Sequence, residues 1–318
     1  TSFISFHYEA KKIMSIQKYR AFLTASEQKS LTKAANILGY TQPGISLMIS
    51  SLEQELGLQL LFRGKNGVSP TAEALRLQPY MQQIVSAENT LQEMSCQLKG
   101  IEMGELKVGG FMSVCTQWFP DIVSTYLARH PGIDLRIFEG TYGEVQSWLT
   151  DGKIDIAIIS YPQPNGFHFL PLWEDPTLAV LSSENPLAHH EFIDLQELIQ
   201  FPFIVPNQGA NETIQHVLQS EHLEPNVRFT IKGDIATVSM VARNLGVSLI
   251  PELAIIPIYP NIVTRPLTKP YFRTLGICAK SFKHMSPAAL AFIQQVKDFI
   301  RNKWMVRHHG ARITPGIP

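Results

Sequence analysis

The sequence predicts an α/β protein in which a helix-rich N-terminal part, a long linker helix and a larger α/β region follow one another. Three observations lead to this prediction. Residues 30–67 hold two short amphipathic helices joined by a turn that contains glycine. Residues 77–98 repeat apolar side chains every seven positions. From residue 105 onward, apolar strands alternate with helical segments, a pattern that builds βαβ units and a parallel sheet.

Composition limits the class of protein further. The 318 residues, 45% of them hydrophobic and 17% charged, suffice for two or three globular domains. The net charge is zero, so no overall field attracts nucleic acid, although residues 14–80 hold seven basic against four acidic side chains. That local excess suits nucleic-acid binding but also occurs on ordinary surfaces. Sparse cysteines and the lack of a long apolar run lead us to expect a cytoplasmic protein without membrane contact.

The first predicted helix runs from Ile16 to about Gln28, with Ser15 as its N-cap and an apolar face toward the helices that follow. Lys18 and Arg20 lie elsewhere on its surface. They would contact phosphate or remain solvated, and solvation is the more common outcome for such side chains.

Two further helices follow, over residues 31–38 and from about Thr41 to Glu55. Gly39 ends the first, because glycine takes the left-handed C′ conformation without strain. Thr41 is a suitable N-cap for the second, and Pro43 fits its first turn. Two short helices joined by such a turn form a helix-turn-helix, whose second helix enters the DNA major groove.

A two-stranded wing is predicted after these helices. Leu60–Phe62 and Val68–Ser69 flank a basic tip, Arg63-Gly-Lys-Asn-Gly67. Leu47 would contact thymine methyl groups, and the wing cations would contact phosphate or the minor groove. The complete set of predicted DNA-binding residues is Ser30, Thr32, Thr41, Gln42, Pro43, Ser46, Leu47, Ser50, Arg63 and Lys65.

A linker helix is expected from Thr71 to about Lys99, and Pro79 would bend it near its start. Its a and d positions form an apolar seam roughly 30 Å long, which predicts helix pairing between two chains. The alternative is that this stripe packs against the chain's own C-terminal domain. The predicted dimerisation residues are Leu77, Tyr80, Ile84, Ala87, Leu91, Met94 and Leu98.

A short glycine-containing segment, residues 100–105, precedes the α/β region. Its predicted strands are 106–109, 134–138, 155–160, 178–182, 203–205, 226–231, 247–250 and 271–280. Its predicted helices are 117–129, 144–151, 195–198, 213–221, 236–244 and 287–303. We expect Leu127 to face inward on the first of these helices.

The N-terminal pattern resembles the LysR-type bacterial transcriptional regulators. The residues that carry the likeness are Phe22, Ser30-Leu31-Thr32-x-Ala34-Ala35, Leu38, Thr41-Gln42-Pro43, Ile45-Ser46, Ile49, Leu52-Glu53-x-x-Leu56-Gly57, Leu60, Phe62-Arg63 and Thr71. The likeness continues more loosely to about Trp304. It departs at Leu47, where family members usually carry a basic residue.

The resemblance implies a winged helix-turn-helix domain (14–70), a dimerisation linker helix (71–99) and a two-lobed, periplasmic-binding-protein-like effector domain (100–304). Lobe I would comprise residues 105–161 and 267–304, and lobe II residues 162–266. Residues 1–13 are interpreted as an extension or as vector-derived, and 305–318 as a tail. The implied partners are double-stranded DNA with a dyad operator, a second copy of the chain in a dimer or tetramer, and RNA polymerase.

Hydroxyl and amide side chains follow several predicted strands. Open α/β sheets bind ligands at the carboxyl ends of their strands, so these residues predict a site for a small polar or anionic effector. The alternative is that each one only caps its helix. The predicted effector-binding residues are Ser113, Val114, Thr116, Thr141, Ser160, Pro206, Asn207, Gln208, Gly209 and Thr237.

No enzyme or metal motif was found, so we expect no catalysis, no metal and no cofactor. Two other functions are weighed: a small-molecule binding protein without a DNA role, and an enzyme that uses the α/β cleft. Cys115 lies beside the predicted effector site, which makes a thiol-based redox switch a further alternative, although no resolving cysteine is evident.

Overall fold

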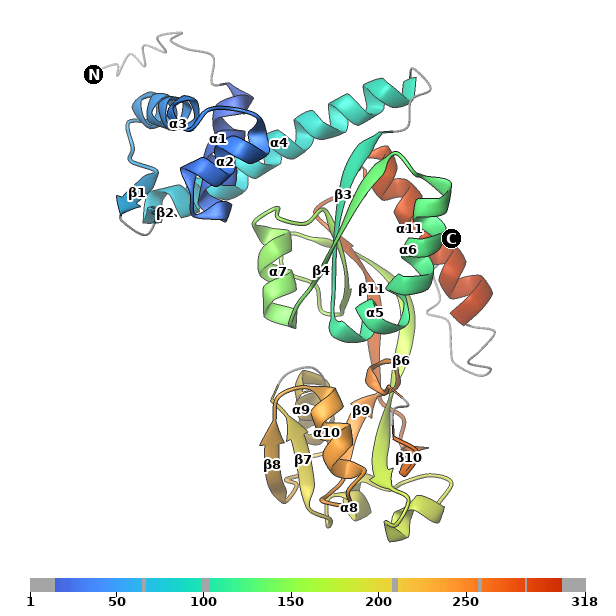
Figure 1. Cartoon of the computed structure of the whole chain (residues 1–318). Coiled ribbons are helices and arrows are strands. Elements are labelled where there is room, and N and C mark those ends of the chain that lie inside the picture. Colours follow the sequence, from blue (N-terminus) through green and yellow to red (C-terminus); the bar gives the residue numbers. More distant parts are fainter. Residues whose placement is uncertain are drawn as a thin grey trace, which may run out of the picture. The chain divides into compact units, whose positions relative to one another are not determined.

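The computed structural model describes residues 15–64, 67–98, 103–207, 211–256, 259–283 and 285–304. The chain divides into two compact units, residues 1–92 and 93–318, which are described separately (Figure 1). The predictions for residues 1–13, the tail 305–318, Lys65, Gln208 and Gly209 lie outside the described residues.

The first unit begins with the predicted helices α1 (Ile16–Gln28), α2 (Leu31–Leu38) and α3 (Gln42–Leu56). Gly39 ends α2 with φ of 71°, and the Thr41 hydroxyl accepts a hydrogen bond from Gly44 N–H at 3.2 Å. Buried side chains from the three helices form one core, which includes Phe22, Ile45 and Ile49. The helix-turn-helix predicted from the sequence is therefore confirmed.

The wing is an antiparallel pair, β1 (Leu61–Gly64) and β2 (Gly67–Pro70), with Leu61 opposite Pro70. It is joined to α1, because Val68 N–H donates to the Lys29 carbonyl at 3.1 Å. Gly67 has φ of 114°, and a Cβ atom there would lie 2.2 Å from that same carbonyl oxygen. Only glycine fits this position.

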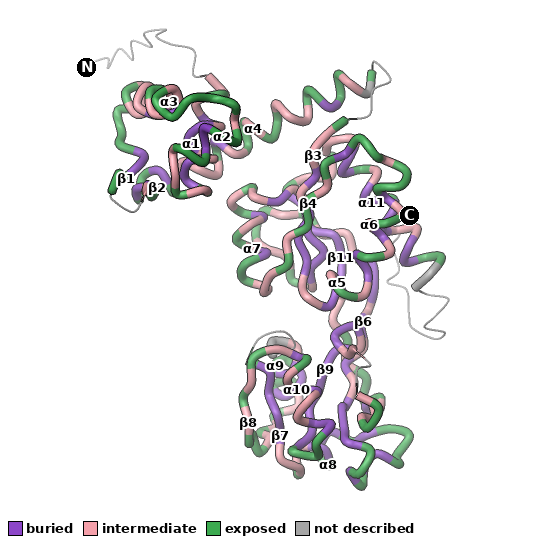
Figure 2. The backbone as a smooth tube through the Cα atoms, viewed as in Figure 1, coloured by how far each residue is buried: buried purple, intermediate pink, exposed green. Residues whose placement is uncertain are grey.

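The linker helix α4 (Ala72–Leu98) continues through Pro79. Ala74 and Met81 are buried in the core of the first unit, and Leu77 packs partly against it. The other seam residues are exposed, among them Tyr80 at 65%, Leu91 at 68% and Leu98 at 89% (Figure 2). Within the first unit, the stripe beyond Met81 is therefore not covered by the helix-turn-helix core.

After the last turns of α4, the second unit continues with β3 (Gly104–Gly110), α5 (Met112–Gln117), α6 (Phe119–Arg129), β4 (Ile133–Glu139), α7 (Tyr142–Thr150) and β5 (Ile156–Ser160). The predicted helix 117–129 corresponds to α6, whereas α5 was not predicted. Leu127 is 38% exposed, so its inward assignment was wrong. Tyr126 is buried instead, and its hydroxyl donates to the Ala288 carbonyl at 2.9 Å.

The main sheet is mixed rather than parallel. Its seven strands follow the order β10-β6-β11-β5-β3-β4, with β9 also paired to β6. The long strand β6 (His168–Ser182) runs antiparallel to β11 (Phe272–Ala279) and, further along, to β9 (Ser248–Pro251) and β10 (Ile262–Pro266). The sequence prediction began this strand only at Leu178, because Pro171, Glu174 and Asp175 interrupt its apolar pattern.

Two of the cores lie at opposite ends of β6, which runs from one lobe to the other in Figure 1. The remaining elements are η1 (Pro186–His189), α8 (Leu195–Leu198), β7 (Phe203–Pro206), α9 (Asn211–Ser220), β8 (Val227–Ile231), α10 (Asp234–Val241), η2 (Glu252–Ala254), α11 (Pro287–Phe299) and η3 (Ile300–Trp304). Leu172 and Trp173 belong to the core that contains β3 and α11, so the change from one lobe to the other falls inside β6.

Candidate functional site

The N-terminal part of α3 presents an exposed surface made from predicted residues. Thr41, Gln42 and Pro43 are exposed, and Leu47 is 73% exposed, although Ile45 and Ile49 beside it are fully buried. Thr32 on α2 is also exposed. The helical period explains this division, since Ile45 and Ile49 share the face that packs on α1 and α2.

Arg63 lies against α3 rather than extending alone from the wing. Its Nη1 atom donates to Ser46 Oγ at 2.9 Å and its Nη2 atom to Ser50 Oγ at 3.1 Å. The structure therefore brings three predicted DNA-binding residues together. The Arg63 side chain is still 43% exposed. Glu53 Oε2 lies 4.0 Å from its guanidinium group.

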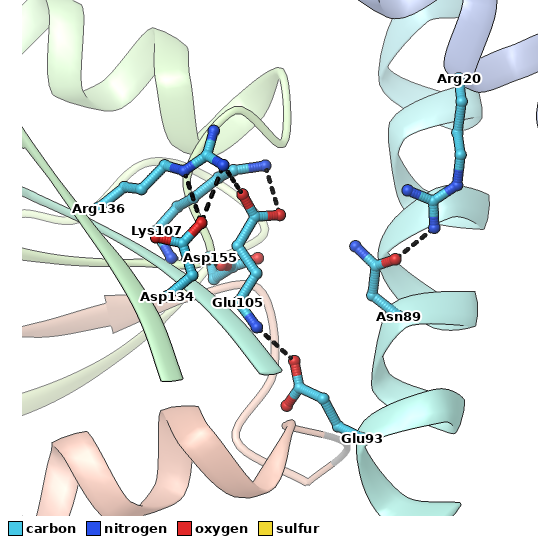
Figure 3. A network of polar contacts seen from close by, with 8 residues as sticks. All are labelled: Arg20, Asn89, Glu93, Glu105, Lys107, Asp134, Arg136 and Asp155. Atoms are coloured by element: carbon cyan, nitrogen blue, oxygen red, sulfur yellow. Dashed lines mark hydrogen bonds and ion pairs between the residues drawn. The ribbon is translucent and has the colours of Figure 1, made fainter. Parts of the chain in front are cut away.

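Lys18 and Arg20 were predicted either to contact phosphate or to remain solvated, and in the structure each pairs with a carboxylate instead. Lys18 Nζ lies 2.6 Å from Glu55 Oε1 and donates to Ser51 Oγ at 2.9 Å. Arg20 pairs with Glu88 at 3.0 Å and also donates to Asn89 of α4 (Figure 3). Both cations therefore join α1 to another helix of the first unit.

Ser30 and Thr41 act as helix caps in this structure. The Ser30 hydroxyl accepts from Lys33 N–H at 3.3 Å, just as Thr41 accepts from Gly44. An open groove of about 400 Å³ lies beyond them, at the C-terminal end of α3, and Ser50 is the one predicted residue that lines it. The predicted DNA-binding residues therefore lie mainly at the exposed start of α3 and not in this groove.

Of the predicted effector residues, Ser113 lies in a polar cluster at the crossing of the two lobes. It is 5% exposed, and its hydroxyl accepts from Arg273 Nη2 at 3.3 Å. Arg273 Nε donates to Asp175 Oδ2 at 2.7 Å, and Asp175 Oδ1 accepts from Leu253 N–H at 2.9 Å. This cluster joins α5, β6, β11 and η2. Sequence reasoning missed Asp175 and Arg273, although charged residues within apolar strands were an available signal.

The other predicted effector residues mostly serve their own elements. Thr141 forms a capping box with Glu144, and the Thr237 hydroxyl donates to the Gly233 carbonyl at 3.0 Å. The Thr116 hydroxyl donates to the Met112 carbonyl at 2.8 Å. Val114 and Pro206 are buried, Ser160 is half-buried and Asn207 is exposed. The capping alternative thus describes Thr141, while Thr116 and Thr237 bond within their own helices.

The thiols of two cysteines are poor nucleophiles in this fold. Burial, with a smaller contribution from Glu139, raises the pKa of Cys115 to about 12. Burial also raises the pKa of Cys278 to about 12. Both thiols are therefore protonated at neutral pH, which disfavours the redox alternative for Cys115.

Neither a metal site nor a membrane-spanning helix is present in the part of the chain that the structure describes. It contains no group of three side chains able to hold a metal ion. It also contains no helix with the length and hydropathy needed to cross a bilayer.

Comparisons with known proteins agree with this arrangement. Residues 16–75 match the family model "Bacterial regulatory helix-turn-helix protein, lysR family", and residues 99–301 match "LysR substrate binding domain". The transcriptional regulator YvbU of Bacillus subtilis (strain 168) is 28% identical over 288 residues, which cover 90% of this chain and 98% of YvbU.

Two solved structures share the fold. Full-length OxyR from Pseudomonas aeruginosa, with a cysteine-to-aspartate substitution, has a TM-score of 0.74 at 23% identity and covers 90% of this chain and 98% of its own. Full-length CbnR in complex with its target DNA has a TM-score of 0.59 at 18% identity, and the match covers 89% of this chain and 99% of the CbnR chain.

Proposed function

Because the chain belongs to the LysR family of DNA-binding transcriptional regulators, we propose that it binds a DNA dyad as a symmetric pair and responds to a small polar or anionic effector. The observation that carries the DNA part is the exposed start of α3, beside which Arg63 is held by Ser46 and Ser50.

In the proposed complex, α3 enters the major groove. Gln42, Pro43, Ser46 and Ser50 lie near base edges, and Leu47 contacts a thymine methyl group. Arg63 has five N–H donors, of which the two serines accept two, so the remaining donors are available to phosphate or bases. Thr32, Ser30 and Thr41 border this surface from α2 and the turn, and Lys65 remains a predicted contact from the wing.

The pairing of two chains through α4 is proposed from its exposed apolar seam. Six side chains at a and d positions, from Tyr80 to Leu98, are exposed in the single chain. Burying a leucine side chain contributes about 1.5–3 kcal/mol, so an uncovered row of this kind favours association. The pair would set the distance between the two copies of α3. A tetramer built from two such pairs, and contact with RNA polymerase, remain predictions.

The effector is proposed to bind at the end of β3, beside Ser113. Asp175 and Ser113 accept two of the five N–H donors of Arg273, so a small anion at this position would find others. A thermal-shift screen of small carboxylates against the wild type and Ser113→Ala tests this site. Equal stabilisation of both proteins by the same carboxylate would contradict it.

The decisive experiment for the DNA role is a mobility-shift assay with DNA from upstream of the gene, at low and physiological salt. We expect a retarded complex of the wild type that Leu47→Glu abolishes, because a carboxylate would face the phosphates. Leu290→Glu, an exposed leucine of α11, is the matched control and should bind as the wild type does. A small-molecule binding protein without a DNA role, or an enzyme, would retard no DNA at low salt.

A further inference from the structure

A buried carboxylate lies near the end of the linker helix. Glu93 of α4 is 7% exposed, although its neighbours Gln92 and Met94 are exposed. Its Oε1 atom accepts a hydrogen bond from the backbone N–H of Glu105 at 3.2 Å (Figure 3). Glu93 is also the first residue of the second unit, so this contact lies entirely within that unit.

The Glu105 backbone N–H that donates to Glu93 belongs to a residue with several further contacts. Glu105 lies in β3, which pairs with both β4 and β5. Its side chain pairs with Lys107 Nζ at 3.2 Å and with Arg136 Nη2 at 3.1 Å. The Lys107 N–H donates in turn to Asp155 Oδ2 at 2.8 Å. Glu93 is therefore bonded to a fixed point of the sheet (Figure 3).

The adjoining residue of β3 leaves room for this carboxylate. A Cβ atom on Gly104 would lie 2.5 Å from Glu93 Cδ and 2.7 Å from its Oε1 atom. Burial raises the pKa of Glu93 more than its hydrogen bonds to Ser286, Glu105 and Ala288 lower it, which means that the surroundings on balance disfavour its charge. Because ionised Glu93 destabilises the fold, its role is better explained by the position that it gives to α4 than by a contribution to the stability of the protein.

We propose that Glu93 is the positioning residue that fixes the last turn of α4 to the sheet of the second unit, the unit in which the effector is proposed to bind. It does so by accepting the hydrogen bond from the Glu105 N–H. Because α4 continues without a break toward the helix-turn-helix, a conformational change in the effector-binding unit reaches α4 at Glu93. This coupling rests on the proposed function, whereas the anchoring contact does not.

Hydrogen exchange of the full-length protein, followed by mass spectrometry, tests the anchoring. Glu93→Ala removes the acceptor, and Gly104→Ala displaces it while keeping its charge. Both should speed exchange at Glu105 and in residues 94–98 about tenfold, as expected when one buried hydrogen bond is lost. Glu93→Gln keeps an acceptor oxygen and should exchange as the wild type does.

The control is Glu191→Gln, which removes one exposed negative charge from the same unit and should change nothing. Unchanged exchange in both Glu93→Ala and Gly104→Ala would overturn the proposal. If Glu93→Ala fails to fold, the comparison of Gly104→Ala with Glu93→Gln still decides it, because only the former displaces the carboxylate.

Duplex DNA from upstream of the gene tests the coupling, since linkage between two sites is reciprocal. Added DNA should alter exchange in residues 103–110 of the wild type, and in residues 285–296, which include the Ser286 and Ala288 partners of Glu93. Glu93→Ala should lose that response while its DNA affinity stays within about twofold. An equal response in Glu93→Ala, or none in the wild type when DNA is bound, would overturn the coupling. Failure of the wild type to bind DNA would instead reject the proposed function.

Discussion

Removal of the Arg63 guanidinium should weaken DNA binding. Comparison with a variant that lacks its two serine partners distinguishes the contribution of its charge from that of its hydrogen bonds. In the free protein, Arg63 is bonded to Ser46 and Ser50 and is 43% exposed. Loss of one cationic contact should flatten the plot of log affinity against log salt by about 0.9 unit. Loss of a side chain that also reaches bases costs about 1–3 kcal/mol, or roughly 5- to 150-fold in affinity.

The assay is fluorescence anisotropy on one labelled upstream duplex between 50 and 200 mM salt, the range over which phosphate contacts reduce affinity strongly. Arg63→Ala should lose affinity and salt slope together. Ser46→Ala with Ser50→Ala keeps the charge, so the slope should stay at the wild-type value while affinity falls. Arg228→Ala, an exposed arginine of the second unit, is the control and should change neither. A wild-type slope in Arg63→Ala would refute the contact.

Three further outcomes are expected. Leu91→Glu, in the middle of the exposed seam, should convert the pair to a monomer in light scattering, and an unchanged mass would reject that seam. The raised pKa of Glu93 means that its ionisation destabilises the fold above the folded-state pKa, and that this penalty is relieved as pH falls toward the ordinary glutamate value. Glu93→Gln should therefore raise the Tm at pH 8, by about 2–4 °C per kcal/mol, and the gain should shrink toward pH 5; a gain that grows on acidification would contradict this. Cys115 should react with a thiol reagent in the native protein far more slowly than after denaturation, and equal rates would restore the redox alternative.

The first unit was largely predictable because its signals are local. Gly39, Thr41 and Pro43 mark the turn between two amphipathic helices, and the same residues end and begin those helices in the structure. The position of Arg63 was not predictable. Its bonds to Ser46 and Ser50 span 17 and 13 residues, and no local pattern specifies such a contact.

The second unit shows where local reasoning fails. Strand alternation predicted a parallel sheet, whereas β6 pairs antiparallel with three strands that lie far from it in sequence. Asp175 interrupts the apolar pattern, yet it is buried because Arg273 on the paired strand neutralises it. The strand-end rule led to Ser113, whose effector role stays a prediction, but it could not point to Asp175 and Arg273, which lie within strands and meet only through strand pairing.

The measurement that tests the central claim most directly is hydroxyl-radical footprinting of the full-length protein on its upstream DNA. Two copies of α3, set apart by the paired linker helices, should protect two sites on one face of the duplex. The sites should be related by a dyad and separated by a whole number of helical turns. A single protected site, or none at low salt, would contradict the claim that this chain reads DNA as a symmetric pair.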